Sequence, residues 1–244
     1  MSEKPICFFD SGIGGSTILK EVIRQLPNEN YIYYADSINN PYGNKTKEEL
    51  FNIVNNIVNK LLKYNPKLIV CACNTATAMV LNDIRKNYPN IVFVGTEPAI
   101  KVIHDKYYDK KTIILTTTGT GESKRFKKLY NTYKTDKCNL VEAPLLAELI
   151  ENDKDTYQYL KELLKDYKDI EIVVLGCTHF PLAKDAIKKV LGNVTFIDGS
   201  MGIANRVKSL LKDNINSKNG SIKIISTKNN VEKRIINIIK RIGD

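Results

Sequence analysis

Long apolar runs are missing from this chain of 244 residues. No stretch approaches the roughly 18 consecutive apolar residues that a membrane-spanning helix needs. The first residues, Met1 to Pro5, also lack the basic and then apolar layout of a secretory signal peptide. We therefore expect a cytoplasmic protein with no membrane partner.

Histidine is scarce, with only His104 and His179, and the five cysteines are odd in number. Cys71 and Cys73 form a Cys-x-Cys pair, but no second pair or nearby histidine has the spacing of a zinc site. An odd cysteine count in a cytoplasmic chain also argues against a disulfide framework. We expect neither a metal site nor disulfides.

Acidic residues are fewer than basic ones, 27 against 37, which gives a net charge of +10. A basic balance can indicate nucleic-acid binding. Here the lysines are spread along most of the expected helices, and no tight cluster interleaves with aromatic residues. A solvated, lysine-rich surface is the preferred interpretation, so nucleic acid is not expected as a partner.

Short apolar runs alternate with amphipathic stretches from end to end. The segment Lys47–Tyr64 has apolar residues at helical spacing, and Thr46 with Glu49 forms a capping box at its start. The expected strands are Ile6–Phe9, Tyr31–Ala35, Leu68–Cys73, Ile91–Gly95, Thr112–Thr116, Asn139–Glu142, Ile172–Gly176, Thr195–Ile197 and Ile222–Ile225. They read as continuous apolar runs, which is typical of strands buried on both faces. This pattern predicts an α/β fold with parallel sheets.

Two segments echo each other. Leu68–Thr75 and Ile172–His179 are both apolar strands that end at a cysteine followed by polar residues. We therefore expect two similar α/β halves with a ligand cleft between them. Residues 1–96 together with 206–244 form the first domain in this interpretation, and residues 97–205 form the second.

A glycine-rich loop, Phe9–Gly15, follows the first expected strand and leads into a helix. Its glycines allow a tight turn and close approach of a ligand to backbone N–H groups. Thr17 stands where a dinucleotide fingerprint needs glycine, and the sequence of a P-loop is absent. A purely structural turn, with Asp10 capping the helix, is the alternative.

Cys73 and Cys177 differ from the other three cysteines because polar residues surround them at the ends of strands. We interpret Cys7, Cys71 and Cys138 as small apolar residues of the interior. His179, two residues from Cys177, is close enough to tune that thiol.

These segments resemble the aspartate/glutamate racemase family. The matching motifs are FDSGIGG (9–15), ADSINNPYGNK (35–45), CNTA (73–76), GCTHFP (176–181) and, more weakly, IDGS (197–200). The resemblance implies two pseudo-symmetric α/β domains that enclose an amino acid, with no cofactor or metal. It further implies cytoplasmic interconversion of L-glutamate and D-glutamate for peptidoglycan synthesis, and it allows for a homodimer.

The resemblance also implies roles for individual residues. Cys73 and Cys177 would be the two catalytic thiols, one on each face of the α-carbon, supported by Asp10 and His179. Glu151 is the best match to a further supporting glutamate, with Glu148 as the alternative. The expected substrate contacts are Ser11, Pro41, Tyr42, Gly43, Asn74, Thr75, Thr120 and Thr178. A free thiol has a pKa of about 8.5, so a base that works near neutrality needs tuning.

The chain departs from the family at Gly121-Glu122, where an apolar and a basic residue are usual. That change bears on substrate preference, so aspartate or a hydantoin stays open as the substrate. A decarboxylase on this fold could work with one cysteine, and the second thiol counts against it. A non-catalytic regulator that binds nucleic acid is the alternative from another class.

Overall fold

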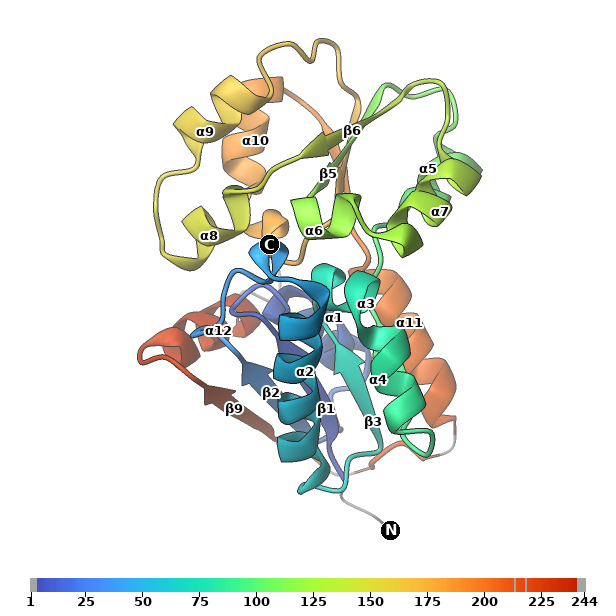
Figure 1. The fold of residues 1–244 in the computed structure, drawn as a ribbon, viewed down its shortest axis with the longest axis vertical. Coiled ribbons are helices and arrows are strands. Elements are labelled where there is room, and N and C mark those ends of the chain that lie inside the picture. The colour runs from blue at the N-terminus through green and yellow to red at the C-terminus, as the bar shows by residue number, and fades with distance from the viewer. Residues whose placement is uncertain (1–3, 213, 218, 241–244) are drawn as a thin grey trace.

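The computed structural model describes residues 4–212, 214–217 and 219–240. Two parallel sheets, one above the other in Figure 1, form the framework. The first sheet has five strands in the order β4 (Phe93–Gly95), β3 (Leu68–Cys71), β1 (Ile6–Asp10), β2 (Tyr31–Ala35) and β9 (Ile222–Ser226). The second has four in the order β6 (Cys138–Glu142), β5 (Thr112–Thr116), β7 (Ile172–Leu175) and β8 (Thr195–Ile197). The predicted α/β class with parallel sheets is confirmed.

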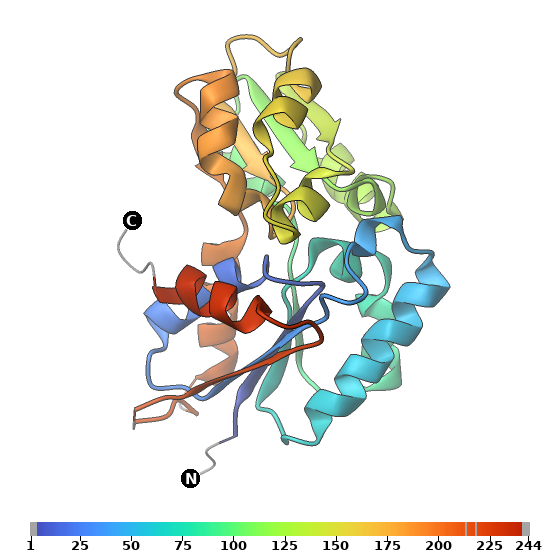
Figure 2. The same cartoon turned by 90° about the vertical axis from the view of Figure 1, so that its left-hand side faces the viewer.

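Helices cover both faces of each sheet, as Figures 1 and 2 show. The helices are α1 (Ser16–Gln25), α2 (Lys47–Leu62), α3 (Asn74–Met79), α4 (Leu81–Asn87), α5 (Ile100–Lys106), α6 (Thr118–Gly121), α7 (Lys124–Tyr133), α8 (Leu146–Glu151), α9 (Tyr157–Leu163), α10 (Lys184–Leu191), α11 (Ser200–Leu211) and α12 (Val231–Lys240). Two short 3₁₀ turns are η1 (Tyr42–Asn44) and η2 (Phe180–Ala183).

Strand β1 illustrates how the sequence builds the first core. Because side chains alternate between the faces of a strand, Ile6 and Phe8 pack with α1, whereas Cys7 and Phe9 pack with α2. All five residues of the strand are buried. A strand covered on both faces needs apolar residues at every position, which explains its continuous apolar run.

Helix α2 begins as predicted but ends earlier. Thr46 accepts a hydrogen bond from the Glu49 N–H while the Glu49 carboxylate accepts one from the Thr46 N–H, so the capping box is confirmed. The helix ends at Leu62 rather than Tyr64. Asn65 has a φ of 50° and precedes Pro66. A proline disfavours helical geometry in the residue before it, so the helix cannot continue here.

Segments distant in sequence complete the first sheet. Strand β9 pairs in parallel with β2, with Ile222 opposite Tyr31. Helix α11 packs against α1, and α12 packs against α1 and β9. One buried cluster runs from the α1 side of the first sheet to the α10 side of the second, so the two halves share apolar packing. None of the described helices combines the length and apolar character needed to cross a bilayer.

Candidate active site

The carboxyl edges of the two sheets face each other, and the cysteines lie between them. Asp10 ends β1, Cys73 follows β3 by two residues, and Cys177 follows β7 by two residues. The hydroxyls of Thr75 and Thr117, one from each half, are 2.9 Å apart. Ligands of open parallel sheets bind at this edge, so the geometry places the candidate site here.

The glycine loop after β1 lies against the loop that follows β7. Asp10 Oδ2 accepts a hydrogen bond of 2.7 Å from the N–H of Gly15, the residue before α1. The purely structural interpretation of Asp10 therefore has a basis, because this contact fixes the turn into the helix. A Cβ on Gly14 would lie 2.5 Å from Nδ1 of His179. Glycine is needed at position 14 for that close approach.

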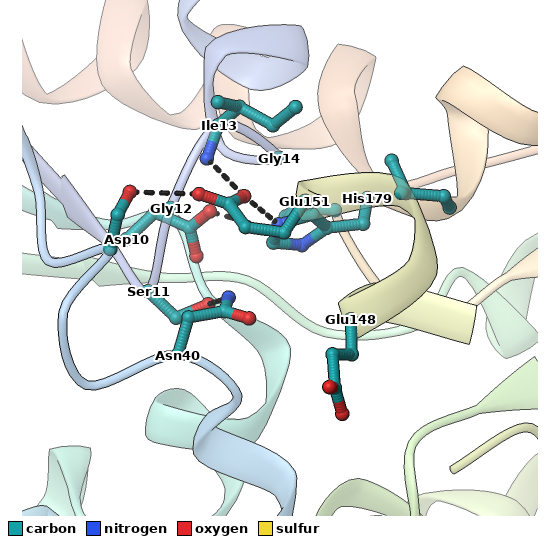
Figure 3. Close-up of polar contacts among 12 residues, drawn as sticks. Asp10, Ser11, Gly12, Ile13, Gly14, Asn40, Glu148, Glu151 and His179 are labelled. Carbon is teal, nitrogen blue, oxygen red and sulfur yellow. Dashed lines mark hydrogen bonds and ion pairs between the residues drawn. The ribbon is translucent and has the colours of Figure 1, made fainter. Parts of the chain in front are cut away.

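Glu151, at the end of α8, connects the two loops (Figure 3). One carboxylate oxygen, Oε2, lies 2.8 Å from Nε2 of His179 and accepts a 2.9 Å hydrogen bond from the Ile13 N–H. The other, Oε1, accepts a 2.8 Å bond from the Ser37 hydroxyl. A Cβ on Gly12 would overlap the carboxyl group. The carboxylate thus has partners in both halves of the molecule.

Glu148 takes no part in these contacts. It lies one turn earlier on α8, and Figure 3 shows its side chain pointing away from His179. Glu148 is half-buried, whereas Glu151 is buried. Of the two glutamates that the sequence left open, the geometry favours Glu151 as the support of His179.

His179 and Glu151 form a charged pair beside Cys177. Burial acts to lower the pKa of His179, but its contacts with Cys177 and Glu151 outweigh burial and raise that pKa well above its ordinary value. Burial acts to raise the pKa of Glu151, but the contact with His179 and two further hydrogen bonds bring it below its ordinary value. Nδ1 of this imidazolium lies 3.9 Å from Sγ of Cys177. The sulfur of Cys177 therefore has an imidazolium beside it.

Cys73 has different surroundings. Burial raises the pKa of its thiol well above its usual range, and the nearby Asp10 carboxylate raises it further. Burial also raises the pKa of Asp10 to about 6, against the opposing effect of His179 and the backbone N–H groups. Oδ1 of Asp10 is buried and has no hydrogen-bond partner among the residues that the structure describes. Cys73 is therefore a neutral thiol beside a carboxylate.

Three threonine hydroxyls close the space between α3 and α6. The Thr75 hydroxyl lies 2.9 Å from that of Thr117 and 3.3 Å from that of Thr120, and Thr117 caps α6 by accepting from the Thr120 N–H. A Cβ on Gly43 would lie 3.3 Å from Cβ of Thr117. The structure thus brings Gly43, Thr75 and Thr120 together and adds Thr117, which the sequence reading did not select.

The loop after β2 turns inward at the edge of the site. The Tyr42 hydroxyl donates a 2.7 Å hydrogen bond to Oδ2 of Asp36, so this phenol is held within its own loop. The Asn40 side-chain amide lies 3.3 Å from the Ser11 hydroxyl, and the Asn40–Pro41 peptide bond is cis. Ser11 is buried beside Asp10.

Asn74 directly follows Cys73, and Thr178 directly follows Cys177. Both line a hollow of about 10 Å³ that also borders Cys177. The Thr178 hydroxyl lies 3.5 Å from Oδ2 of Asp10. Cys73 is 5% exposed and Cys177 is 7% exposed. The two thiols are therefore almost fully shielded from solvent in this conformation.

The remaining predicted assignments follow from burial. Cys7 and Cys71 are fully buried, as expected of apolar interior residues, whereas Cys138 is half-buried. His104 lies on an exposed helix surface next to Asp105. Within residues 4–212, 214–217 and 219–240, no group of three His, Cys, Asp or Glu side chains has the geometry to hold a metal ion.

Ser37 and Thr117 also contact residues of the site, although neither was predicted from the sequence. Ser37 falls inside the matched segment 35–45, and Thr117 lies in a run of three threonines, so both had a positional signal. The neighbouring sequence does not reveal their contacts, because each side chain contacts a residue of the other half.

This chain is similar to known proteins in both sequence and fold. The family model described as Asp/Glu/Hydantoin racemase matches residues 28–205. The glutamate racemase of Clostridium botulinum is 42% identical, with 98% of this chain and 96% of that protein covered. That of Clostridium acetobutylicum is 41% identical, with 93% of each covered. The crystal structure of glutamate racemase from Francisella tularensis in complex with D-glutamate has a TM-score of 0.82 and 26% identity, covering 98% of this chain and 95% of that one. With the geometry of the two cysteine loops, these similarities establish that the chain belongs to the Asp/Glu/hydantoin racemase family.

Proposed function

We propose that this chain interconverts L-glutamate and D-glutamate by proton transfer between Cys73, Cys177 and the α-carbon of the substrate. The observation that carries the proposal is the placement of two thiols after equivalent strands of facing sheets, β3 and β7. Racemisation needs one group on each face of the α-carbon. Two halves that each present a thiol to one cleft meet that need.

The reaction runs in two proton transfers. The thiolate of one cysteine takes the α-proton, and the electron pair stays on the substrate as a carbanion. The thiol of the other cysteine gives its proton to the opposite face, which inverts the centre. The two cysteines have then exchanged protonation states, and the reverse direction uses them in exchanged roles. Positioned acid and base groups contribute roughly 10²- to 10⁴-fold to a rate.

The surroundings of the two thiols differ, and this difference assigns one thiol as the proton donor and the other as the base at the start of the reaction. Cys73 is a neutral thiol beside the Asp10 carboxylate, so it serves as the proton donor. Cys177 has the imidazolium of His179 beside it, so it serves as the base. Glu151 keeps His179 charged and oriented.

Hydroxyl and amide donors around the thiols would hold the substrate. We assign its α-carboxylate to Ser11, Asn74, Thr75 and Thr178, which lie near one thiol or the other. These donors also stabilise the negative charge that develops in the transition state. Pro41, Tyr42, Gly43 and Thr120 remain candidates for the other substrate contacts, and Thr117 joins them because of its contact with Thr75.

The wider assignments are part of the same proposal. D-glutamate made in the cytoplasm would serve peptidoglycan synthesis, and the enzyme would act as a homodimer. The division predicted from the sequence is residues 1–96 with 206–244 against residues 97–205. The boundary at residue 205 falls inside α11, whose packing on α1 favours a boundary before Ser200.

The deciding experiment is incubation with L-glutamate in D₂O without added cofactor. We expect the circular dichroism signal to decay to zero while deuterium replaces the α-proton in the NMR spectrum. Exchange without inversion would mean that only one thiol works. No change with glutamate but decay with aspartate would transfer the proposal to aspartate. If neither amino acid reacts and the protein is retained on DNA in a salt-dependent way, the proposal would be replaced by a nucleic-acid-binding function.

A further inference from the structure

Arg234, on the C-terminal helix α12, reaches across to the second sheet's helix α8. Its Nη2 donates a 2.8 Å hydrogen bond to the carbonyl oxygen of Ile150, and Nη1 donates to the carbonyl oxygen of Glu151. Figure 2 shows α12, in red, just below the end of α8, in yellow. Helix α12 itself packs against α1 and β9 of the first half. Arg234 therefore joins the two halves at one point.

The point that Arg234 holds is the last turn of α8. Carbonyls in the last turn of a helix lack the usual N–H partner four residues later, and they carry the negative end of the helix dipole. Here the Ile150 carbonyl also accepts a 3.2 Å hydrogen bond from the Asp153 N–H. A guanidinium offers several N–H donors in a rigid fork, so it can bind two adjacent carbonyls at once. The second of these carbonyls belongs to Glu151, whose carboxylate holds His179.

Little else fills the space between α8 and α12 around this contact. A cavity of about 350 Å³ lies there, lined by Ile150, Lys154 and Leu182 from the second half and by Ile13, Arg234 and Asn237 from the first. Apolar packing between α8 and α12 is therefore incomplete at this position, although Ile13 and Ile150 belong to one buried cluster. The two hydrogen bonds of Arg234 add a polar link at the end of α8.

We propose that Arg234 is a positioning residue of the racemase site, which fixes the end of α8 so that Glu151 orients His179 against Cys177 and keeps the two halves closed over the thiols. The proposal rests on the function proposed above for its effect on turnover. Its effect on closure does not depend on that function. Arg234 contacts neither thiol and takes no part in the proton transfers.

The test compares Arg234→Met, which keeps much of the side chain's length but no donors, with Arg234→Lys and with Lys233→Ala. Lys233 is the exposed neighbour on the same helix and serves as the matched control. Racemisation kinetics give kcat and KM. Timed alkylation with iodoacetamide, followed by mass spectrometry of each cysteine peptide, reports closure without requiring activity. Cys7 and Cys71 are internal standards, because both are fully buried residues of strands in the first sheet.

We expect Arg234→Met to lower kcat at least tenfold with a smaller change in KM, and to speed alkylation of Cys73 and Cys177 several-fold while Cys7 and Cys71 stay protected. Arg234→Lys should recover part of both effects, and Lys233→Ala should match the parent. Equal acceleration at all four cysteines would mean general loosening and would overturn the proposal. So would unchanged kcat and unchanged alkylation. If the parent chain racemises nothing but Arg234→Met still exposes the two thiols selectively, the proposed function fails and the closing role stands.

Discussion

Cys73 and Cys177 follow equivalent strands, one in each sheet, yet their neighbours have opposite charge. Cys73 lies near the Asp10 carboxylate, which acts to keep the thiol protonated. Cys177 lies near a protonated histidine held by Glu151. In the proposed mechanism, similar backbone placement gives the two thiols access to both faces of the α-carbon, while the dissimilar side chains beside them distinguish the proton donor from the base. Geometric symmetry and electrostatic asymmetry would then serve different parts of one reaction.

Replacing each thiol separately is the strongest test of this comparison. Cys73→Ser and Cys177→Ser should each lower racemisation by about 10² to 10⁴, because a hydroxyl is a far poorer base than a thiol. Each variant should still exchange the α-proton of one enantiomer in D₂O, the enantiomer differing between the two variants. NMR of separate L- and D-glutamate samples measures this. Exchange of the same enantiomer by both variants would contradict the placement of the thiols on opposite faces.

Asp10 provides a test on the Cys73 side through stability. Its folded-state pKa of about 6 exceeds its ordinary value of 3.8, so the stability it contributes is present below about pH 4 and is lost as the pH rises through 6. Those two values correspond to about 3 kcal/mol of unfolding free energy at 1.36 kcal/mol per pKa unit. Asp10→Asn lacks this titration. Between pH 4 and pH 7, urea unfolding should show the free energy of unfolding of the parent falling relative to that of Asp10→Asn by about that amount. A constant difference across that range would mean that burial of the charge has no cost.

Glu151 provides the corresponding test on the Cys177 side, with Glu148 as its control. Glu151→Gln removes the charge that supports the imidazolium, so the pKa of His179 should fall and the alkaline limb of the kcat/KM profile should move to lower pH. We expect a loss of about tenfold near neutrality, comparable to one charged hydrogen bond of roughly 1.5 kcal/mol. Glu148→Gln should leave the profile in place. An equal effect of both substitutions would mean that the charge of α8, rather than the contact with His179, matters.

The fold was largely predictable because its strands are buried on both faces. Tyr31–Ala35, Thr112–Thr116 and Thr195–Ile197 have the predicted bounds, and the other strands differ by one or two residues. Where the apolar run continues past the last ladder hydrogen bond, as at Cys73, sequence places the end too late. The predicted strand at Ile91 begins two residues later, at Phe93.

The supporting contacts of the site were less predictable, for a physical reason. Glu148 and Glu151 are both acidic residues of one short helix, and only tertiary packing buries one carboxylate against His179. Ser37 reaches Glu151 across 114 residues of chain, and Arg234 reaches it across 83. No periodic pattern encodes such pairings. Motifs reveal residues in the loops next to the chemistry, whereas the residues that hold those loops depend on how the halves meet.

The position of β9 bears on the order in which the molecule can be made. The second sheet uses one continuous stretch of chain, from Thr112 to Ile197, whereas the first needs Ile222–Ser226 beside β2. A ribosome that builds the chain from its N-terminus finishes the four-stranded sheet while the five-stranded one still has an open edge along β2. Both thiols are synthesised before β9 exists. In the first half, β2 therefore has an unpaired edge until residues Ile222–Ser226 have been synthesised.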